Sequence, residues 1–159
     1  RNNQWEQVER SRRRQNLTFD RDAVILDAVR TPHFISTEDL AESRWSEEYR
    51  RRDVLAVTDR DNNILALSLH RSLPAVMKTS IGLVSEVDPF TGIVKLERLQ
   101  DWSEGYRRWT PNPDDLVLDL EGALVFDDNS LIQSKDLQPG NTVYLVHDLA
   151  TGYLVFKIS

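Results

Sequence analysis

The sequence contains no cysteine, and it has only one methionine among its 159 residues. Without cysteine there are no disulfides, cysteine-ligated zinc sites, iron–sulfur clusters or cysteine nucleophiles. Only three histidines are present, and His33, His70 and His147 lie far apart in the sequence, which leaves little for a histidine-based metal site. We therefore expect no cofactor, and these absences point away from an enzyme.

Glycine and proline are also scarce, with six of each, which excludes collagen-like and low-complexity chains. No apolar run approaches the roughly 18 residues that a membrane-spanning helix needs. Hydrophobic residues make up 40% of the chain and charged residues 29%, a balance typical of a soluble globular protein. The length predicts one domain or two very small ones.

Negative charge is concentrated in the last third of the chain. Residues 110–159 contain two lysines and eight acidic residues, which accounts for the whole net charge of −6. The remaining residues, 1–109, are therefore neutral in sum. An acidic region of this kind is a poor electrostatic match for a phosphate backbone, so the charge argues against a nucleic-acid partner.

Period-two alternation with β-branched enrichment predicts short strands along most of the chain. The predicted strands are 22–29, 53–59, 63–69, 81–88, 92–99, 115–120, 123–126, 141–147 and 152–158. One short helix is expected at about 37–51, with Thr37 as its N-cap, and residues 1–16 form a tail or a short helix. Two turns, DPFTG and DLATG, are expected to close with Gly92 and Gly152 in the left-handed region.

An internal repeat is the strongest signal in the sequence. DAVILD at 22–27 aligns with DDLVLD at 114–119, and ISTEDL at 35–40 aligns with IQSKDL at 132–137. The segment 54–69 then aligns without a gap with 143–158. Three similar blocks in the same order predict a duplication.

The repeat predicts an all-β protein with minor helix, in which two small OB-like or Greek-key barrel units are related by internal duplication. The second unit, 80–159, has five strands and is complete. The first unit, 17–73, lacks the opening hairpin that 81–99 supplies in the second. The predicted core faces are listed here: Val24, Leu26, Leu55, Val57, Leu65 and Leu67 in the first unit; Val84, Val94, Leu96, Leu116, Leu118, Val143, Leu145, Leu154 and Phe156 in the second.

The second unit resembles β-barrel modules of bacterial, clostridial-type S-layer-homology cell-surface proteins. The resemblance is carried by GLVSEVDPFTG (82–92), a tryptophan-containing linker at 101–109, DLQPGNTVYLV (136–146) and GYLVFKI (152–158). The first unit departs from this pattern, because RRRDV (50–54) stands where the Pro-Gly-Asn turn is expected. The resemblance implies a non-catalytic surface module, and it brings no active-site residues.

Two clusters of aromatic and arginine residues are the best candidates for a ligand-binding surface, because aromatic faces beside guanidinium groups stack on sugars or bases and bind phosphate. One cluster is Tyr49, Arg50 and Arg51, and the other is Tyr106, Arg107, Arg108 and Trp109. The alternative is that the arginine stems pack over the aromatic rings at a barrel rim. Trp5 and Trp102 occupy matching linker positions and are expected to plug the barrel ends.

Other chemistry finds little support in the sequence. Asp127 and Asp128 could form at most a weak calcium site, and no other metal site is expected. No G-x-S-x-G elbow is present for Ser/His/Asp catalysis, and the histidines are interpreted as solvent-edge residues at strand ends.

We therefore expect a non-catalytic structural or interaction module of an extracytoplasmic bacterial surface protein. The alternative is a ligand-binding module for cell-wall polymer, glycan or nucleic acid that uses these two aromatic–arginine clusters as a rim. Expected partners are cell-wall polymer or other surface-protein domains. The chain begins at Arg1, which favours a processed piece of a longer protein with its targeting segment elsewhere.

Overall fold

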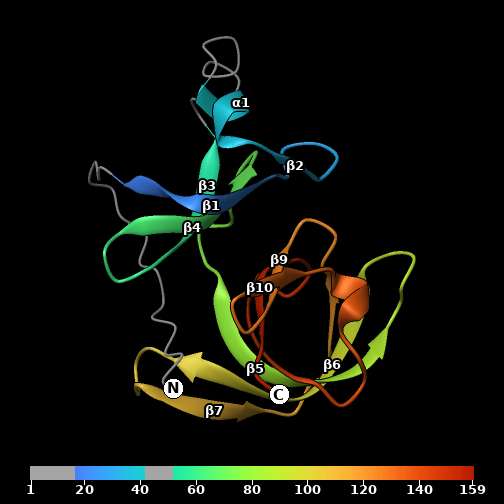
Figure 1. The fold of residues 1–159 in the computed structure, drawn as a ribbon. Helices are drawn as coiled ribbons and strands as arrows, with labels where there is room; N and C mark the ends of the chain where they lie inside the picture. The colour runs from blue at the N-terminus through green and yellow to red at the C-terminus, as the bar shows by residue number, and fades with distance from the viewer. Residues whose placement is uncertain (1–16, 42–51) are drawn as a thin grey trace.

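The computed structural model describes residues 17–41 and 52–159, and these residues form an all-β protein with little helix (Figure 1). The twelve strands found in these residues belong to two separate sheets. The predicted fold class, all-β with minor helix, is confirmed. No helix within the described ranges is long and apolar enough to cross a membrane.

The first sheet has four strands in the order β2-β1-β4-β3. Its strands are β1 (Thr18–Asp27), β2 (His33–Ile35), β3 (Asp53–Thr58) and β4 (Asn63–His70). β1 runs parallel to β4, whereas β2 and β3 are antiparallel to their neighbours. A five-residue helix, α1 (Thr37–Ala41), follows β2; the rest of the predicted helix at 37–51 lies outside the described residues.

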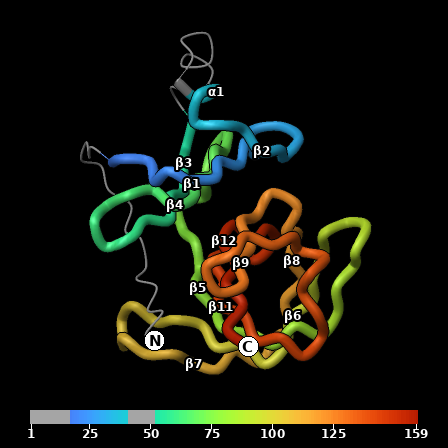
Figure 2. Tube along the Cα trace, viewed as in Figure 1, coloured from blue at the N-terminus to red at the C-terminus, as the bar shows by residue number. Residues whose placement is uncertain are grey.

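The second sheet has eight strands, and it curls into a barrel that Figure 2 shows nearly end-on. The strands are β5 (Lys78–Val87), β6 (Ile93–Ser103), β7 (Arg108–Asn112), β8 (Leu116–Asp119), β9 (Leu124–Asp127), β10 (Ser130–Ile132), β11 (Thr142–His147) and β12 (Gly152–Lys157). Their order is β10-β9-β12-β11-β5-β6-β7, and β8 pairs with β6. A bridge between Asp119 and Thr151 brings the end of β8 back to β12 and closes the barrel.

The first sheet has the same pairing pattern as half of the second. The order β2-β1-β4-β3 matches β10-β9-β12-β11, and in both sets the two middle strands are parallel. Asp27 pairs with His33 as Asp127 pairs with Ser130. Each hairpin also has a register shift at the same place, where Leu65 and Tyr153 are skipped.

These pairings correct the alignment of the sequence repeat. The segment 22–27 lies in β1, whose partners match those of β9, whereas 114–119 contains β8, which pairs with β6. The two hairpins also differ by one residue. Val57 and Ala66 pair as Val146 and Leu154 do, so the connection between the strands is one residue shorter in the second hairpin.

Equivalent corners follow β2 and β10. The carboxylate of Asp39 accepts a hydrogen bond from the backbone N–H of Ser36 at 3.2 Å, and that of Asp136 accepts one from Gln133 at 2.9 Å. The leucine after each aspartate turns inward: Leu137 is 2% exposed in the barrel core, and Leu40 packs against the buried residues of the first sheet. A single 3-10 turn, η1 (Ser134–Asp136), forms the second corner.

The core has three parts. One fills the barrel, and it includes Val84, Leu96, Leu118 and Leu145. A second joins the two sheets, since Leu26, Leu55, Val57 and Ala66 of the first pack with Leu124, Phe126, Tyr153, Leu154 and Phe156 of the second. A third covers the other face of the first sheet and includes Ile25, Ile64, Leu67 and Leu69.

The faces that meet in the second cluster occupy the same register positions in the two sheets. Leu26 corresponds to Phe126, and Ala66 corresponds to Leu154. The two sheets therefore contact each other through equivalent faces. This packing makes the two sheets one body, with hydrophobic burial on both sides of the contact.

The bulges explain where the predicted core faces were wrong. Leu65 is only half-buried while Ile64 and Ala66 are buried, and Leu67 is buried as predicted but lies in the third cluster. Leu154 and Phe156 are buried as predicted, but they face the first sheet, and Val155 faces the barrel. Skipping one residue in a strand moves the following side chains to the opposite face.

Two further local predictions were wrong. The expected linker 101–109 is the tip of a hairpin, because β6 continues to Ser103 and β7 begins at Arg108. Gly152 lies in β12, and the left-handed residue of that turn is Leu149. Packing favours glycine at position 152, since a Cβ there would force the side chain of Leu120 to shift. Gly92 has the expected positive φ, of 74°.

Candidate functional site

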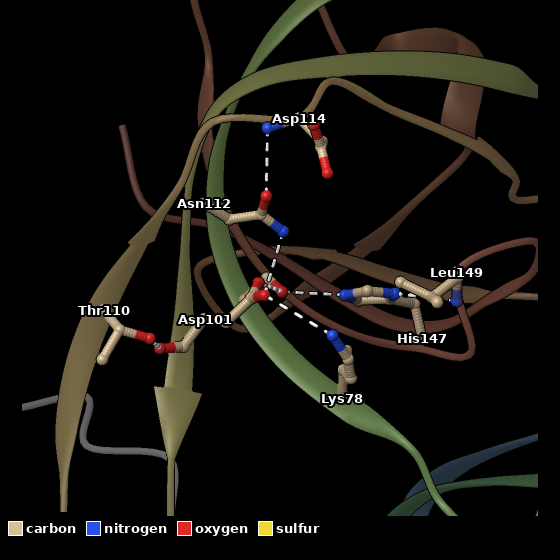
Figure 3. A network of polar contacts seen from close by, with 8 residues as sticks. Lys78, Asp101, Thr110, Asn112, Asp114, His147 and Leu149 are labelled. Atoms are coloured by element: carbon tan, nitrogen blue, oxygen red, sulfur yellow. Dashed lines mark hydrogen bonds and ion pairs between the residues drawn. The ribbon is translucent and has the colours of Figure 1, made fainter. Parts of the chain in front are cut away.

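A buried polar network joins three strands of the barrel. Ser80 on β5 lies between Asp101 on β6 and His147 on β11: its Oγ is 2.6 Å from Asp101 Oδ1 and 2.8 Å from His147 Nε2. Ser80 and His147 are 0% and 1% exposed. Lys78 and Asn112 approach the other carboxylate oxygen of Asp101, with Lys78 Nζ at 3.7 Å and Asn112 Nδ2 at 3.0 Å (Figure 3).

The backbone fixes the direction of the hydrogen bonds in this network. The N–H of Leu149 donates to His147 Nδ1 at 3.1 Å, so Nδ1 is an acceptor and Nε2 carries the proton (Figure 3). Nε2–H then donates to Ser80 Oγ, and the Ser80 hydroxyl donates to Asp101. In a hydrolase triad the histidine accepts the serine proton, and the carboxylate orients the histidine. Here the histidine donates to the serine, and the carboxylate accepts from the serine instead of orienting the histidine, so this geometry cross-links strands and leaves the serine hydroxyl without a base.

Burial controls the charge of the two buried histidines, His70 and His147. Desolvation lowers the pKa of His147, although Asp101 acts in the opposite direction. Desolvation also lowers the pKa of His70, against the raising effect of Asp53. His70 is 6% exposed, and its Nε2 is 2.7 Å from Ser68 Oγ. The interpretation of His70 and His147 as solvent-edge residues is therefore wrong, because neighbouring strands cover both rings.

Tyr153 connects the junction of the two sheets to the turn before β12. Its ring meets that of His70 edge-on at 5.3 Å, and its hydroxyl donates to Asp148 Oδ2 at 3.0 Å. Burial, and then the Asp148 carboxylate, raises the pKa of Tyr153 to about 12. The phenol is therefore a neutral hydrogen-bond donor at physiological pH.

The second aromatic–arginine cluster lies at the tip and along the strands of the β6–β7 hairpin. Tyr106, Arg107 and Arg108 are exposed, and the Arg108 guanidinium lies 5.2 Å from the centre of the Tyr106 ring. Arg107 has a φ of 51°, as the tight turn requires. We call Trp102, Tyr106, Arg107, Arg108 and Trp109 the aromatic–arginine rim.

Ring contacts connect the rim to the core. Trp102 and Trp109 are cross-strand partners with centroids 5.4 Å apart, and Trp109 meets Tyr144 at 6.0 Å. Tyr144 in turn lies 6.0 Å from Phe156. Trp102 therefore lies in a hairpin beside Trp109, not at a barrel end as predicted. The aromatic pair holds the hairpin on the barrel wall and keeps the rim rigid.

The first aromatic–arginine cluster, Tyr49, Arg50 and Arg51, lies outside the described residues, as does Trp5. At the suggested calcium position, Lys157 Nζ lies 3.3 Å from Asp127 Oδ2 and neutralises that carboxylate. Asp128 has a φ of 55° in the turn between β9 and β10. No group of three or more potential metal-ligating side chains occurs in residues 17–41 and 52–159.

A shallow hollow of about 410 Å³ lies where β2 approaches β10 and η1. Its lining consists of Phe34, Leu131, Ile132, Gln133, Lys135 and Asp136. Phe34 is 57% exposed and holds the same register position as Leu131. The hollow is thus a seam between equivalent strands of the two sheets.

Sequence reasoning missed the network of Ser80, Asp101 and His147. Ser80 is 21 residues from Asp101 and 67 from His147, so no spacing in the sequence joins them. The only available signal was a serine just before the predicted strand 81–88 and a histidine at the end of the predicted strand 141–147. No protein-family model, curated protein or solved structure matches this chain.

Proposed function

We propose that this chain is a non-catalytic structural and interaction module of an extracytoplasmic bacterial surface protein, built from two copies of one ancestral β unit. The observation that carries the proposal is the repeated pairing: two four-strand sets share strand order, parallel centre and bulge. They pack through equivalent faces into one apolar cluster. Tandem units joined in this way make a stiff spacer, because bending would expose that cluster.

The polar chemistry of the barrel supports a structural role. The buried network forms hydrogen bonds among its own side chains, Ser80, Asp101 and His147, and with groups on the surrounding strands. A buried, fully hydrogen-bonded network of this kind fixes strand register. The resemblance to S-layer-homology surface proteins supports the extracytoplasmic location.

Protease shaving of intact cells that express the natural full-length protein tests the location. We expect the segment containing this chain to be cleaved on intact cells while a cytosolic marker survives. Retention of the segment until the cells are lysed would refute an exposed extracytoplasmic position.

A second candidate function is binding of an anionic cell-wall polymer at the aromatic–arginine rim. The observation that favours it is the exposure of Tyr106, which is 76% exposed with Arg108 stacked beside it. Tyrosine and tryptophan faces stack on sugar rings, and the two arginines supply positive charge. The half-buried tryptophans behind them provide the rigid support that a binding platform needs.

Titration with teichoic acid tests this second function. We expect Arg107→Ala and Trp109→Ala each to weaken binding about tenfold, which is about 1.4 kcal/mol. Added salt should weaken wild-type binding as well. Arg71→Ala is the matched control, because Arg71 is an exposed arginine that follows β4 in the other sheet. Equal affinities in the rim and control variants would exclude the rim.

A further inference from the structure

The outer edge of β3 differs from its counterpart in the second sheet. β11 has β12 on one side and β5 on the other. β3 pairs with β4, and no strand in the described part of the chain pairs with its other side. Among residues 17–41 and 52–159, β3 is thus the last strand of the first sheet, whereas the second sheet continues from β11 into β5 and β6.

Val54 and Val143 hold equivalent positions in the two sheets, and their side chains differ in exposure. Val54 pairs with Leu69 as Val143 pairs with Lys157. Val143 also has Gly82 of β5 on its other side, and it is 1% exposed. Val54 is 49% exposed. The backbone N–H and C=O groups along a strand edge are the template for pairing with another strand, and Val54 adds an exposed apolar side chain that such a strand can cover.

We propose that the outer edge of β3 binds one extended segment, antiparallel, in the register that β5 adopts on β11. The inference deepens the interaction role proposed above and names its partner as a strand of the β5 type. By this register, the partner residue that takes the place of Gly82 lies opposite Val54, and the one that takes the place of Lys78 lies opposite Thr58.

The charge at the end of β3 fits a strand of this composition. Asp59 follows Thr58 directly, and its carboxylate accepts hydrogen bonds from the N–H groups of Asp61 and Asn63 at 2.9 Å. The hydrogen bond from the N–H of Asn63 is the largest cause that lowers the pKa of Asp59, which keeps the carboxylate ionised. A cationic residue at the Lys78 position would lie beside this fixed negative charge.

Disulfide trapping tests both the site and the register, because the chain has no cysteine of its own. The chain with Val54→Cys is incubated in glutathione buffer with the peptide KTSIGLVSEV (78–87), which carries either Gly82→Cys or Ser85→Cys. Directly opposed residues bring their Cβ atoms to about 5 Å, close enough for a disulfide after small shifts. We expect about tenfold more cross-linking with the Gly82→Cys peptide, since position 85 falls beyond the end of β3.

The matched control is Val117→Cys, which places a thiol on β8 at a valine that is 54% exposed. It should cross-link equally with both peptides. A second pair, Thr58→Cys with the Lys78→Cys peptide, tests the same register if Val54→Cys fails to fold by circular dichroism.

Three results would overturn the proposal. The first is equal trapping of both peptides by Val54→Cys, and the second is trapping no greater than that of Val117→Cys. The third is a dimer of the unmodified chain in sedimentation, with Val54→Cys chains cross-linked to each other and not displaced by peptide, which would make a second copy the occupant. None of these results depends on the rim or on protease shaving, so the inference and the proposed function fail independently.

Discussion

Mild acid should destabilise this protein, because two buried imidazoles are neutral in the native state. His147 and His70 are 1% and 6% exposed, and desolvation lowers the pKa of each below its ordinary value of 6.5. Protonation of His147 would also place a proton on Nδ1, which accepts the N–H of Leu149. Both effects make the charged ring less compatible with the folded barrel than with the unfolded chain.

The sign and size follow from proton linkage. Below pH 6.5 the unfolded chain binds protons at both rings, whereas the native protein does not until the pH reaches the lowered native pKa values. Stability is therefore complete above pH 6.5 and falls as the pH is lowered. Each histidine contributes a slope of up to about 1.4 kcal/mol per pH unit, and the two together up to about 2.7.

Urea unfolding at pH 7.5, 6.5, 6.0 and 5.5 measures this slope directly. His147→Gln should remove about half of it, and His70→Gln the other half, whatever each substitution does to stability at pH 7.5. His33→Gln is the control, because that ring is exposed and solvated in both states. A flat free energy of unfolding between pH 7.5 and 5.5 would refute the reasoning. The turn carboxylates Asp59 and Asp88 act at lower pH: the N–H groups of Asn63 and Phe90 lower their pKa below 3.8, and that stability is lost only in stronger acid.

Three further predictions can be checked by urea unfolding at pH 7.5. Ser80→Ala should cost about 1–3 kcal/mol, because it leaves His147 Nε2–H and Asp101 Oδ1 without their shared partner; a loss below about 0.5 kcal/mol would mean that water replaces the hydroxyl. Phe156→Ala should cost about 3–5 kcal/mol, since the ring stacks on Phe126 where the sheets meet, and Phe90→Ala, at a ring 95% exposed, should cost under about 0.5. Gly152→Ala should cost about 1–3 kcal/mol through its collision with Leu120. That cost should shrink when Leu120→Ala is already present; equal costs in the two backgrounds would contradict the packing argument.

The longer strands were predictable because period-two alternation depends only on having one buried face. β3 and β11 begin and end within one residue of the predicted limits. The strands that were missed, β2, β7 and β10, have three to five residues, too few for alternation to be visible. β7 also contains Pro111, which argues against a strand. The structure accommodates this proline because β7 is the edge strand of its sheet.

Of the candidate sites, the sequence reveals the one whose residues are neighbours along the chain and hides the one that tertiary contacts bring together. Tyr106, Arg107, Arg108 and Trp109 were identifiable because they are neighbours in the sequence, and the hairpin keeps them together. What the sequence could not show is that Trp102 pairs with Trp109, because that contact needs the turn between β6 and β7. The network of Ser80, Asp101 and His147 depends on closure of the barrel, a tertiary event with no local signature.

The turns, more than the strands, carry the similarity between the two halves of the chain. A strand needs only apolar residues on its buried face, so Leu26 can correspond to Phe126 without a change in pairing. A turn needs a specific acceptor for its backbone N–H groups, and aspartate supplies one. Asp39 and Asp136 do so after β2 and β10, and Asp59 and Asp148 do so in the two hairpins.

The same chemistry explains why one block of the repeat was misaligned. Asp20 and Asp119 each accept a hydrogen bond from the N–H two residues later, just before the regular parallel pairing of β1 and β9. The alignment by sequence instead matched the aspartates at both ends of 22–27 and 114–119, which lie in different pairings. Asp27 and Asp119, which that alignment matched, also accept the N–H two residues later. The same turn chemistry therefore recurs at strand ends that are not equivalent in the fold, and only the strand pairing shows which aspartates correspond.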